Sequence, residues 1–178
     1  MTCIVGLMEN GKVYIGADKS SSCGGVIRKT ALNKVFKKGS YIIGYTTSFR
    51  MGQLLEHVIE LPEPPEAGAD LHFMVSSFVE KIRKDFKGYG FSTVDNNEET
   101  GGTFLVGVNR KIFKINSDYQ VGLYEDNFAC CGSGEEYAEA VMEALKDIVS
   151  PKERIAKAIK IAGKFVMSVT QDCVILEN

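Results

Sequence analysis

Two short apolar runs near the start of the chain, separated by an Asn-Gly pair, constrain the fold more than any other feature. The first run covers residues 3–7, the second covers residues 13–17, and Asn10-Gly11 lies between them. Asn-Gly suits a type I′ turn, because both central residues of that turn need a positive φ. The sequence therefore predicts an antiparallel β-hairpin at this point of the chain.

Length and composition predict one globular domain over residues 1–178. The chain is 44% hydrophobic and 25% charged, which is ordinary for a protein with a sizeable core. Its net charge of -2 gives no general attraction to nucleic acids or to anionic membranes. No apolar run approaches the roughly 20 residues that a transmembrane helix needs. We therefore expect neither a nucleic-acid partner nor a membrane.

The cysteine content indicates a reducing compartment. The chain has five cysteines, an odd number, and only two histidines. Because no Cys-x-x-Cys pair is present, the pattern predicts neither a disulfide framework nor a zinc site. The start of the chain also lacks the basic and apolar regions of a secretory signal. A cytoplasmic location is the expectation.

Strand-like and helix-like segments follow one another in blocks. Helical periodicity is expected over residues 48–61, 70–87, 135–149 and 151–165, and strands over 3–7, 13–17, 26–27, 35–36, 41–44, 103–108, 111–115, 128–131 and 173–176. This order differs from the strict β-α alternation of a parallel doubly wound fold. It predicts an α+β protein, with two antiparallel sheets packed together and a helix pair covering each, as a four-layer αββα sandwich.

Two details of this prediction are specific enough to check. The apolar stripe of the second helix includes Phe78, Ile82 and Phe86, which should pack against a sheet. Segment 18–25 is expected to be a polar, glycine-bearing loop. Segment 88–102 is expected to be a long exposed loop, because it is rich in Asp, Asn, Glu, Ser and Gly.

Three polar residues at strand ends are candidates for chemistry. If Met1 were removed, Thr2 would carry a hydroxyl nucleophile and a free amine base on one residue. Asp18 follows the second strand, and Lys34 precedes the strand at residues 35–36. Taken singly, each has an ordinary interpretation, since aspartate and lysine at strand ends are usually solvated. An ordinary first strand is also the better interpretation of Thr2 by itself.

Taken together, several motifs resemble the proteasome β-subunit family, and most closely its bacterial HslV-type peptidases. They occur in the family's order and are Thr2-Cys3-Ile4-Val5-Gly6, Ile15-Gly16-Ala17-Asp18, Asn33-Lys34-Val35, Gly44, Cys131-Gly132-Ser133-Gly134 and the helical segment 158–163. The resemblance covers most of the chain. It implies an N-terminal-nucleophile hydrolase fold and a threonine-type endopeptidase.

The resemblance also implies a role for each matching residue. Thr2 would attack the peptide bond, and its α-amine would take the proton. Lys34 would lower the pKa of that amine, while Asp18 would compensate the charge of Lys34. The N–H of Gly44 would stabilise the oxyanion, and Ser133 would orient the amine.

A cation site follows from the same resemblance. Backbone carbonyls of Gly163, Val166 and Val169 would hold a structural monovalent cation such as Na⁺, although the chemistry itself needs no cofactor. The chain departs from the family directly after Gly44, where the run Tyr45 to Arg50 lacks the second glycine. The acidic segment 88–102 has no clear counterpart in the family.

The expected partners are other copies of the chain and protein or peptide substrates. HslV-type peptidases form a homo-oligomeric double ring and pair with an AAA+ ATPase unfoldase, so both features are expected here. Two alternatives stay open. One is a stand-alone N-terminal-nucleophile amidohydrolase acting on a small amide, and the other is a catalytically inactive shell protein. Retention of Met1 would favour the inactive shell.

Overall fold

The computed structural model describes residues 2–23, 26–66 and 68–178. One antiparallel sheet has the strand order β12-β1-β2-β13, with β1 at Ile4–Glu9, β2 at Lys12–Asp18, β12 at Phe128–Cys131 and β13 at Cys173–Glu177. The predicted N-terminal hairpin is confirmed, because β1 and β2 pair in the register Gly6↔Ile15. Asn10 and Gly11 both have positive φ, as a type I′ turn requires.

A second antiparallel sheet has the order β11-β10-β9-β6-β5. Its strands are β5 at Val35–Lys38, β6 at Tyr41–Tyr45, β9 at Phe104–Val108, β10 at Lys111–Ile115 and β11 at Val121–Gly122. All its neighbouring strands pair in the antiparallel direction. The chain is therefore an α+β protein with antiparallel sheets, as the block order predicts.

Helices α4 (Glu135–Ala144) and α5 (Pro151–Phe165) pack on the first sheet. Ser150 caps α5 by accepting a hydrogen bond from the N–H of Glu153, at 3.4 Å. Gly16 of β2 lets α5 approach closely, because a Cβ there would lie 2.4 Å from Cγ2 of Ile155. The prediction that the first of these helices continues to residue 149 is wrong, since α4 ends at Ala144 and turns follow.

The other helices cover the second sheet. Helix α1 (Phe49–Gln53) continues into the π-helical turn η1 (Leu54–Val58), and α2 (Leu71–Phe73), η2 (Met74–Phe78) and α3 (Val79–Gly88) form one helical segment. Phe78, Ile82 and Phe86 are fully buried in a cluster with residues of β9 and β10. Their predicted packing against a sheet is confirmed.

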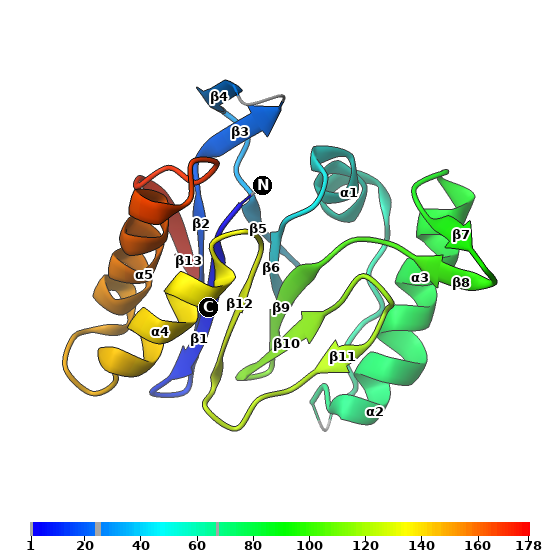
Figure 1. Ribbon diagram of the computed structural model, residues 1–178. Coiled ribbons are helices and arrows are strands. Elements are labelled where there is room, and N and C mark those ends of the chain that lie inside the picture. The colour runs from blue at the N-terminus through cyan, green and yellow to red at the C-terminus, as the bar shows by residue number, and fades with distance from the viewer. Residues whose placement is uncertain (1, 24–25, 67) are drawn as a thin grey trace.

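A further cluster of buried side chains contains residues of both sheets. Its members are Ile4, Val13, Ile15, Ala17, Val35, Ile42, Leu105, Ile112, Ala129 and Cys131. Figure 1 shows both sheets between α4 and α5 on one side and α1 and α3 on the other. The N-terminal end of β1 therefore lies between layers of packed side chains, which hold it in a fixed position.

Both segments predicted as loops contain strands, so these two predictions are wrong in part: segment 18–25 holds the first strand of a hairpin, and segment 88–102 holds a whole hairpin. Strand β3 (Ser20–Cys23) pairs with β4 (Val26–Lys29), and β7 (Thr93–Asp95) pairs with β8 (Glu98–Thr100). In the second hairpin the two turn asparagines have positive φ, which asparagine tolerates well. An ion pair of 2.8 Å between Arg83 and Glu99 attaches this hairpin to α3. Within the described residues, no helix has the length and apolar character to cross a membrane.

Candidate active site

Thr2 lies just before β1 at the bottom of a small pocket. Its side chain is buried, with the residue 4% exposed, and its Oγ1 accepts a hydrogen bond of 3.1 Å from Nζ of Lys34. The pocket has a volume of about 180 Å³ and is lined by Thr2, Ser21, Ser22, Lys34 and residues 45–49. The structure therefore brings together two of the residues that the sequence predicts, from positions 32 residues apart.

Asp18, at the end of β2, forms a buried ion pair with Lys34. Its Oδ1 lies 2.7 Å from Nζ of Lys34, and both side chains are almost fully shielded from solvent. Backbone N–H groups of Cys3, Ser20 and Thr170 also donate to the carboxylate, at 2.9, 2.9 and 3.3 Å. These donors compensate a buried carboxylate that would otherwise be costly. The predicted neighbourhood of Asp18 and Lys34 is thus present.

Burial destabilises the charged form of Lys34. Burial lowers the pKa of Lys34 below its usual value, and the opposing effect of the Asp18 carboxylate only offsets part of this shift. The buried Asp18–Lys34 pair therefore places charged groups directly beside the Thr2 hydroxyl.

The turn after β12 contacts Thr2 from the other side. Gly132 has a φ of 99°, and a Cβ there would lie 2.3 Å from the carbonyl oxygen of Thr2. Oγ of Ser133 and the N–H of Gly134 both donate to that carbonyl, each at 3.3 Å. Ser133 therefore reaches the site as predicted, and its contact in the structure is with the carbonyl group of Thr2.

Gly44 does not reach the pocket, and its predicted position at the oxyanion is wrong. It lies inside β6, paired with Val35 of β5 and Leu105 of β9. The next N–H, that of Tyr45, donates to Lys34 O at 2.9 Å toward β5. Since successive N–H groups of a strand point to opposite sides, the N–H of Gly44 points toward β9. Gly44 is required for sheet packing, because a Cβ there would lie 2.6 Å from Cγ2 of Ile4.

Thr47, three residues after Gly44, lies at the Thr2 pocket. It lines the pocket with Thr2 and has a φ of 66°, which is uncommon for a β-branched residue. Its side chain accepts a hydrogen bond from the N–H of Thr103, at 3.1 Å. Its own N–H has no hydrogen-bond partner among the described residues. The missing second glycine after Gly44 was the signal, because it marks a changed turn at this point.

Two serines of the site were missed by sequence reasoning. Ser20 contacts the Asp18 carboxylate and donates to the carbonyl of Ser168 at 2.6 Å, while Oγ of Ser168 lies 3.2 Å from Oγ of Ser133. Ser20 lay in a segment predicted to be a loop, and Ser168 lies in the turn after α5. Nothing in their local sequence distinguishes them from ordinary surface serines.

The three residues of the predicted cation site lie together at the end of α5. Gly163 is in its last turn, Val166 is its C-cap, and the carbonyl of Val166 accepts a hydrogen bond of 3.0 Å from the N–H of Val169. A carbonyl oxygen has two lone pairs, so this bond leaves room for a cation. The end of a helix also favours positive charge, so the residues fit a cation. Among the described residues, no cluster of His, Cys, Asp and Glu side chains could hold a metal.

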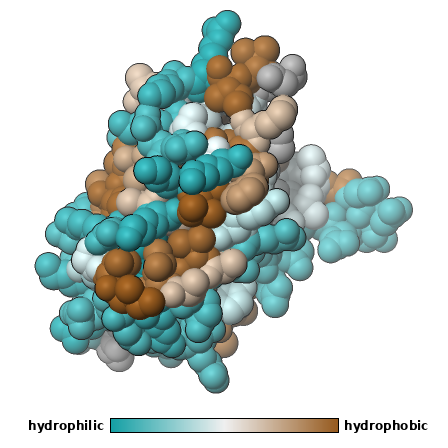
Figure 2. All heavy atoms as spheres, turned by 60° about the vertical axis from the view of Figure 1, so that its left-hand side comes forward, coloured by the Kyte–Doolittle hydropathy of each residue, from teal (hydrophilic) through white to brown (hydrophobic). Residues whose placement is uncertain are grey.

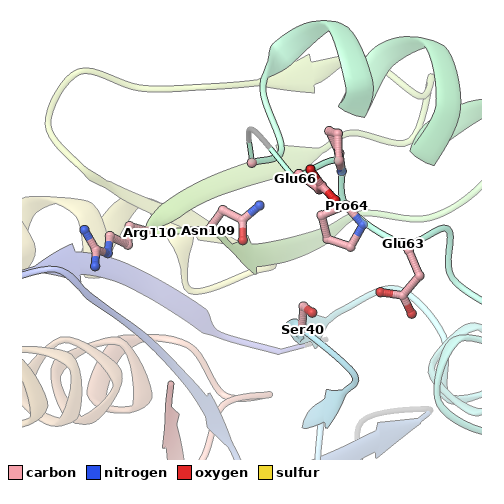
Figure 3. A pocket seen from close by; sticks show the side chains of 8 residues that line it. Ser40, Glu63, Pro64, Glu66, Asn109 and Arg110 are labelled. Carbon is pink, nitrogen blue, oxygen red and sulfur yellow. The ribbon is translucent and has the colours of Figure 1, made fainter.

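A larger hollow of about 520 Å³ lies at the opposite end of β6 from the Thr2 pocket. It is formed by Ser40, the proline-rich segment 63–66, Gly68 and the β9–β10 turn. In Figure 3, Glu63, Pro64 and Glu66 lie on one side of this space and Asn109 points toward them, whereas the side chain of Arg110 points away. The predicted removal of Met1 concerns a residue outside the described part of the chain.

Comparison with known proteins gives similar sequences and similar structures. The chain is 26% identical over 175 residues to proteasome subunit beta 1 of Thermococcus onnurineus (strain NA1), covering 92% of this chain and 81% of that protein. No protein-family model matches the chain.

Two solved structures share the fold over nearly the whole chain. The structure of Thiobacillus denitrificans BPH in complex with epoxomicin has a TM-score of 0.83 at 17% identity, covering 99% of this chain and 97% of that chain. Eukaryotic HslV from Trypanosoma brucei has a TM-score of 0.68 at 18% identity, covering 98% of each chain. With the sequence similarity, these findings confirm the resemblance to the proteasome β-subunit family that the motifs predict.

Proposed function

We propose that this chain, similar in sequence and fold to the proteasome β-subunit family, is a threonine-type endopeptidase with Thr2 as its nucleophile. The observation that carries this proposal is the contact of 3.1 Å between Nζ of Lys34 and Oγ1 of Thr2. Lys34 is in turn held by Asp18 at 2.7 Å. A hydroxyl hydrogen-bonded to a buried lysine differs from that of an ordinary surface threonine, because a positive charge beside it favours loss of its proton.

The proposed reaction begins with removal of Met1, which frees the α-amine of Thr2. An α-amine has a pKa of about 7.7–8.0, so a large fraction is neutral near physiological pH. It takes the proton from Oγ1 as that oxygen attacks the substrate carbonyl, and the proton then passes to the leaving amine. The resulting ester on Thr2 is hydrolysed by water, with the same amine acting as base. Lys34 supplies a nearby positive charge that disfavours protonation of the amine.

The oxyanion of this reaction needs a backbone donor, and we assign that role to Thr47. It lines the same pocket as Thr2, and the structure gives its N–H no partner among the described residues. The positive φ of Thr47 strains the backbone, and residues with strained backbone conformations are often found at functional sites. One oxyanion donor typically contributes about 10²–10³ in kcat.

Self-association into a double ring is part of the proposal. Exposed apolar side chains lie near the end of α5, where Tyr137 and Phe165 stack at 5.2 Å and Met167 is 81% exposed. Figure 2 shows hydrophobic side chains interrupting the hydrophilic surface of the face that carries α4 and α5. Such patches are typical of contact surfaces. A closed ring needs heterologous contacts between copies, and an AAA+ ATPase is the expected partner for unfolding protein substrates.

The proposal also covers the full order of helix and sheet layers in the fold and the cellular location of the protein. The burial of three apolar clusters, one between the sheets and one under each helix group, supports the four-layer αββα sandwich. Within the described residues, Cys3, Cys130, Cys131 and Cys173 are free thiols, which is compatible with the reducing cytoplasm.

The decisive experiment compares three variants in a casein-like protein assay and a fluorogenic peptide assay. Thr2→Ala should abolish turnover, Thr2→Ser should retain some, and the exposed Thr93→Ala should behave as the wild type. Intact mass should show loss of one methionine. Epoxomicin, bound in the Thiobacillus BPH structure, should add its mass to the wild type and not to Thr2→Ala.

The alternatives predict different results. A strict monomer at micromolar concentration that hydrolyses only small amides would support the stand-alone amidohydrolase. Retained Met1 with no turnover would support the inactive shell. Turnover unchanged in Thr2→Ala, in a preparation free of other proteases, would overturn the threonine mechanism.

The cation site is a separate part of the proposal. Carbonyls of Gly163, Val166 and Val169 would hold Na⁺ and stiffen the turn that carries Ser168 and Thr170. Replacing Na⁺ with choline at constant ionic strength should lower the melting temperature. An equal melting temperature in both salts would show that Na⁺ does not stabilise this turn.

A further inference from the structure

Thr2 is held from two sides, and two buried serines connect these sides. On one side Lys34 contacts the Thr2 hydroxyl, and on the other Ser133 contacts the Thr2 carbonyl. Ser20 and Ser168 lie between the two and are 1% and 4% exposed. The proposed reaction uses neither of them as nucleophile, base or oxyanion donor. Their polar atoms are nevertheless buried together beside the site, which is costly unless each is hydrogen-bonded.

Ser20 brings three groups together around one oxygen. Its Oγ contacts Oδ2 of Asp18, lies 2.6 Å from the carbonyl of Ser168, and lies 3.5 Å from Nζ of Lys34. Its N–H also donates to Oδ2 of Asp18 at 2.9 Å. A hydroxyl has a single proton, so the two acceptors share one donor. The position of this oxygen therefore fixes how the carboxylate faces Lys34.

Ser168 connects this group to the turn on the other side of Thr2. Its carbonyl accepts from Ser20, and its Oγ lies 3.2 Å from Oγ of Ser133. Ser133 in turn donates to the carbonyl of Thr2 at 3.3 Å. The contacts thus run from the Thr2 hydroxyl, through Lys34, Asp18 and the two serines, back to the Thr2 carbonyl. Because they close on one residue, a shift at any member changes the geometry at Thr2.

We propose that Ser20 and Ser168 are positioning residues for the reaction at Thr2, and that they connect the Lys34–Asp18 pair to the Ser133 turn. This inference rests on the proposed function, since it concerns the same site. Ser20 acts through Asp18 and sets the charge that Lys34 experiences. Ser168 acts through Ser133 and sets the orientation of Thr2.

The two serines should have different effects on pH dependence. Without the Ser20 hydroxyl, Oδ2 of Asp18 loses one donor, and its negative charge acts more strongly on Lys34. That change stabilises the ammonium form of Lys34. The titratable groups that face Lys34 are Asp18 and Cys3, with the amine of Thr2 once Met1 is removed, and Ser20→Ala leaves all of them in place. Ser168→Ala keeps its carbonyl and therefore leaves the Asp18 contacts unchanged.

The test measures kcat, KM and the pH profile of kcat/KM on a fluorogenic peptide. Ser20→Ala should lower kcat roughly tenfold or more, with KM nearly unchanged, as expected from one lost hydrogen bond to a charged group. The acidic limb of its pH profile, which reports protonation of the Thr2 amine, should move to lower pH by about half a unit or more, because a more fully charged Lys34 disfavours a second positive charge beside it. Ser168→Ala should lower kcat roughly fivefold with no movement of the limb. Ser20→Thr, which keeps the hydroxyl, should restore the wild-type limb.

Ser76→Ala is the matched control, since that exposed hydroxyl contacts a helix carbonyl and the neighbouring Ser77 hydroxyl, far from Thr2 in the sequence. If Ser20→Ala matches the wild type in kcat and in its acidic limb, the inference is wrong. The inference is equally wrong if Ser20→Ala lowers both kcat and the melting temperature, its acidic limb does not move, and Ser20→Thr does not restore kcat. Should Ser20→Ala fail to fold, Ser168→Ala decides: a lower kcat at an unchanged melting temperature supports the inference, and an unchanged kcat overturns it. Turnover in Thr2→Ala would instead remove the proposed function itself.

Discussion

Replacing Lys34 by methionine tests the centre of the site, because it removes a charge while keeping a long unbranched side chain. Lys34 is 2% exposed and pairs with Asp18 at 2.7 Å. The variant leaves Asp18 buried without its counter-charge. It also removes the only side-chain cation that contacts Thr2 Oγ1 among the described residues. Both stability and turnover should therefore change together.

The size of the stability change follows from the partners that Asp18 keeps. Removing one member of a buried ion pair costs about 3–5 kcal/mol. Asp18 retains three backbone N–H donors and the Ser20 hydroxyl, and methionine fills most of the vacated volume. We therefore expect the lower end, about 3 kcal/mol, which corresponds to a fall of about 6–12 °C in melting temperature for a chain of this size.

Urea unfolding at a fixed protein concentration measures this change, and its pH dependence gives a second check. The folded pKa of Lys34 lies below the usual 10.5, because burial disfavours its charge. Between that lowered pKa and 10.5, the unfolded chain binds more protons than the folded chain. The wild-type free energy of unfolding should therefore rise with pH across this interval, and its advantage over Lys34→Met should widen there.

The combined variant Asp18→Asn with Lys34→Met separates charge from packing. It should be more stable than the sum of the single losses predicts, because neither partner is left as an unpaired buried charge. Peptide turnover should be lost in Lys34→Met as fully as in Thr2→Ala, since the two residues act as one unit. A Lys34→Met protein with wild-type stability and turnover would refute the reasoning about this pair.

Variants at three glycine and turn positions give further checks. Thr47→Pro should lower kcat by about 10²–10³ or more, because it removes the proposed oxyanion donor and because proline cannot adopt the φ of 66° found there. Thr47→Gly keeps the N–H and accepts that φ, so its turnover should stay within about threefold; a loss equal to that of Thr47→Pro would take the oxyanion role away from Thr47. Gly44→Ala should lower the free energy of unfolding by about 1–3 kcal/mol in urea, since its Cβ would lie 2.6 Å from Ile4 and 2.8 Å from Ile15. Unchanged stability would contradict the packing described here. Gly132→Ala should abolish peptide turnover, because its Cβ would meet the Thr2 carbonyl oxygen at 2.3 Å and its φ of 99° is unfavourable for alanine; wild-type turnover would show that this turn is free to move.

The sequence was sufficient to predict those strands, turns and helices that are specified by neighbouring residues in the chain. Asn10-Gly11 determines a turn with two positive φ values, and the apolar runs on either side become β1 and β2. The stripe of Phe78, Ile82 and Phe86 has helical spacing, and these side chains are buried as expected. Such patterns are readable because the period of the backbone decides which side chains share a face.

The sequence was insufficient where a structure depends on contacts between distant segments. The second hairpin, β7–β8, is attached to α3 through Arg83 and Glu99, and its residues by themselves resemble an exposed loop. Helix α4 ends earlier than its periodicity suggests. The error at Gly44 has the same origin, because only the pairing of β6 with both neighbours reveals which way its N–H points.

For the site itself, the sequence determined which residue types are present, and the tertiary structure decided which of them meet. Thr2, Asp18, Lys34 and Ser133 could be named from motifs that a known family shares. Their distances could not, because Lys34 reaches Thr2 only when the two sheets pack, and Ser133 reaches it only when β12 pairs with β1. Ser20 and Ser168 are 148 residues apart, and each has an ordinary local sequence. Hydrogen bonds of this kind leave no local pattern, since only the folded chain brings donor and acceptor within 3 Å of each other.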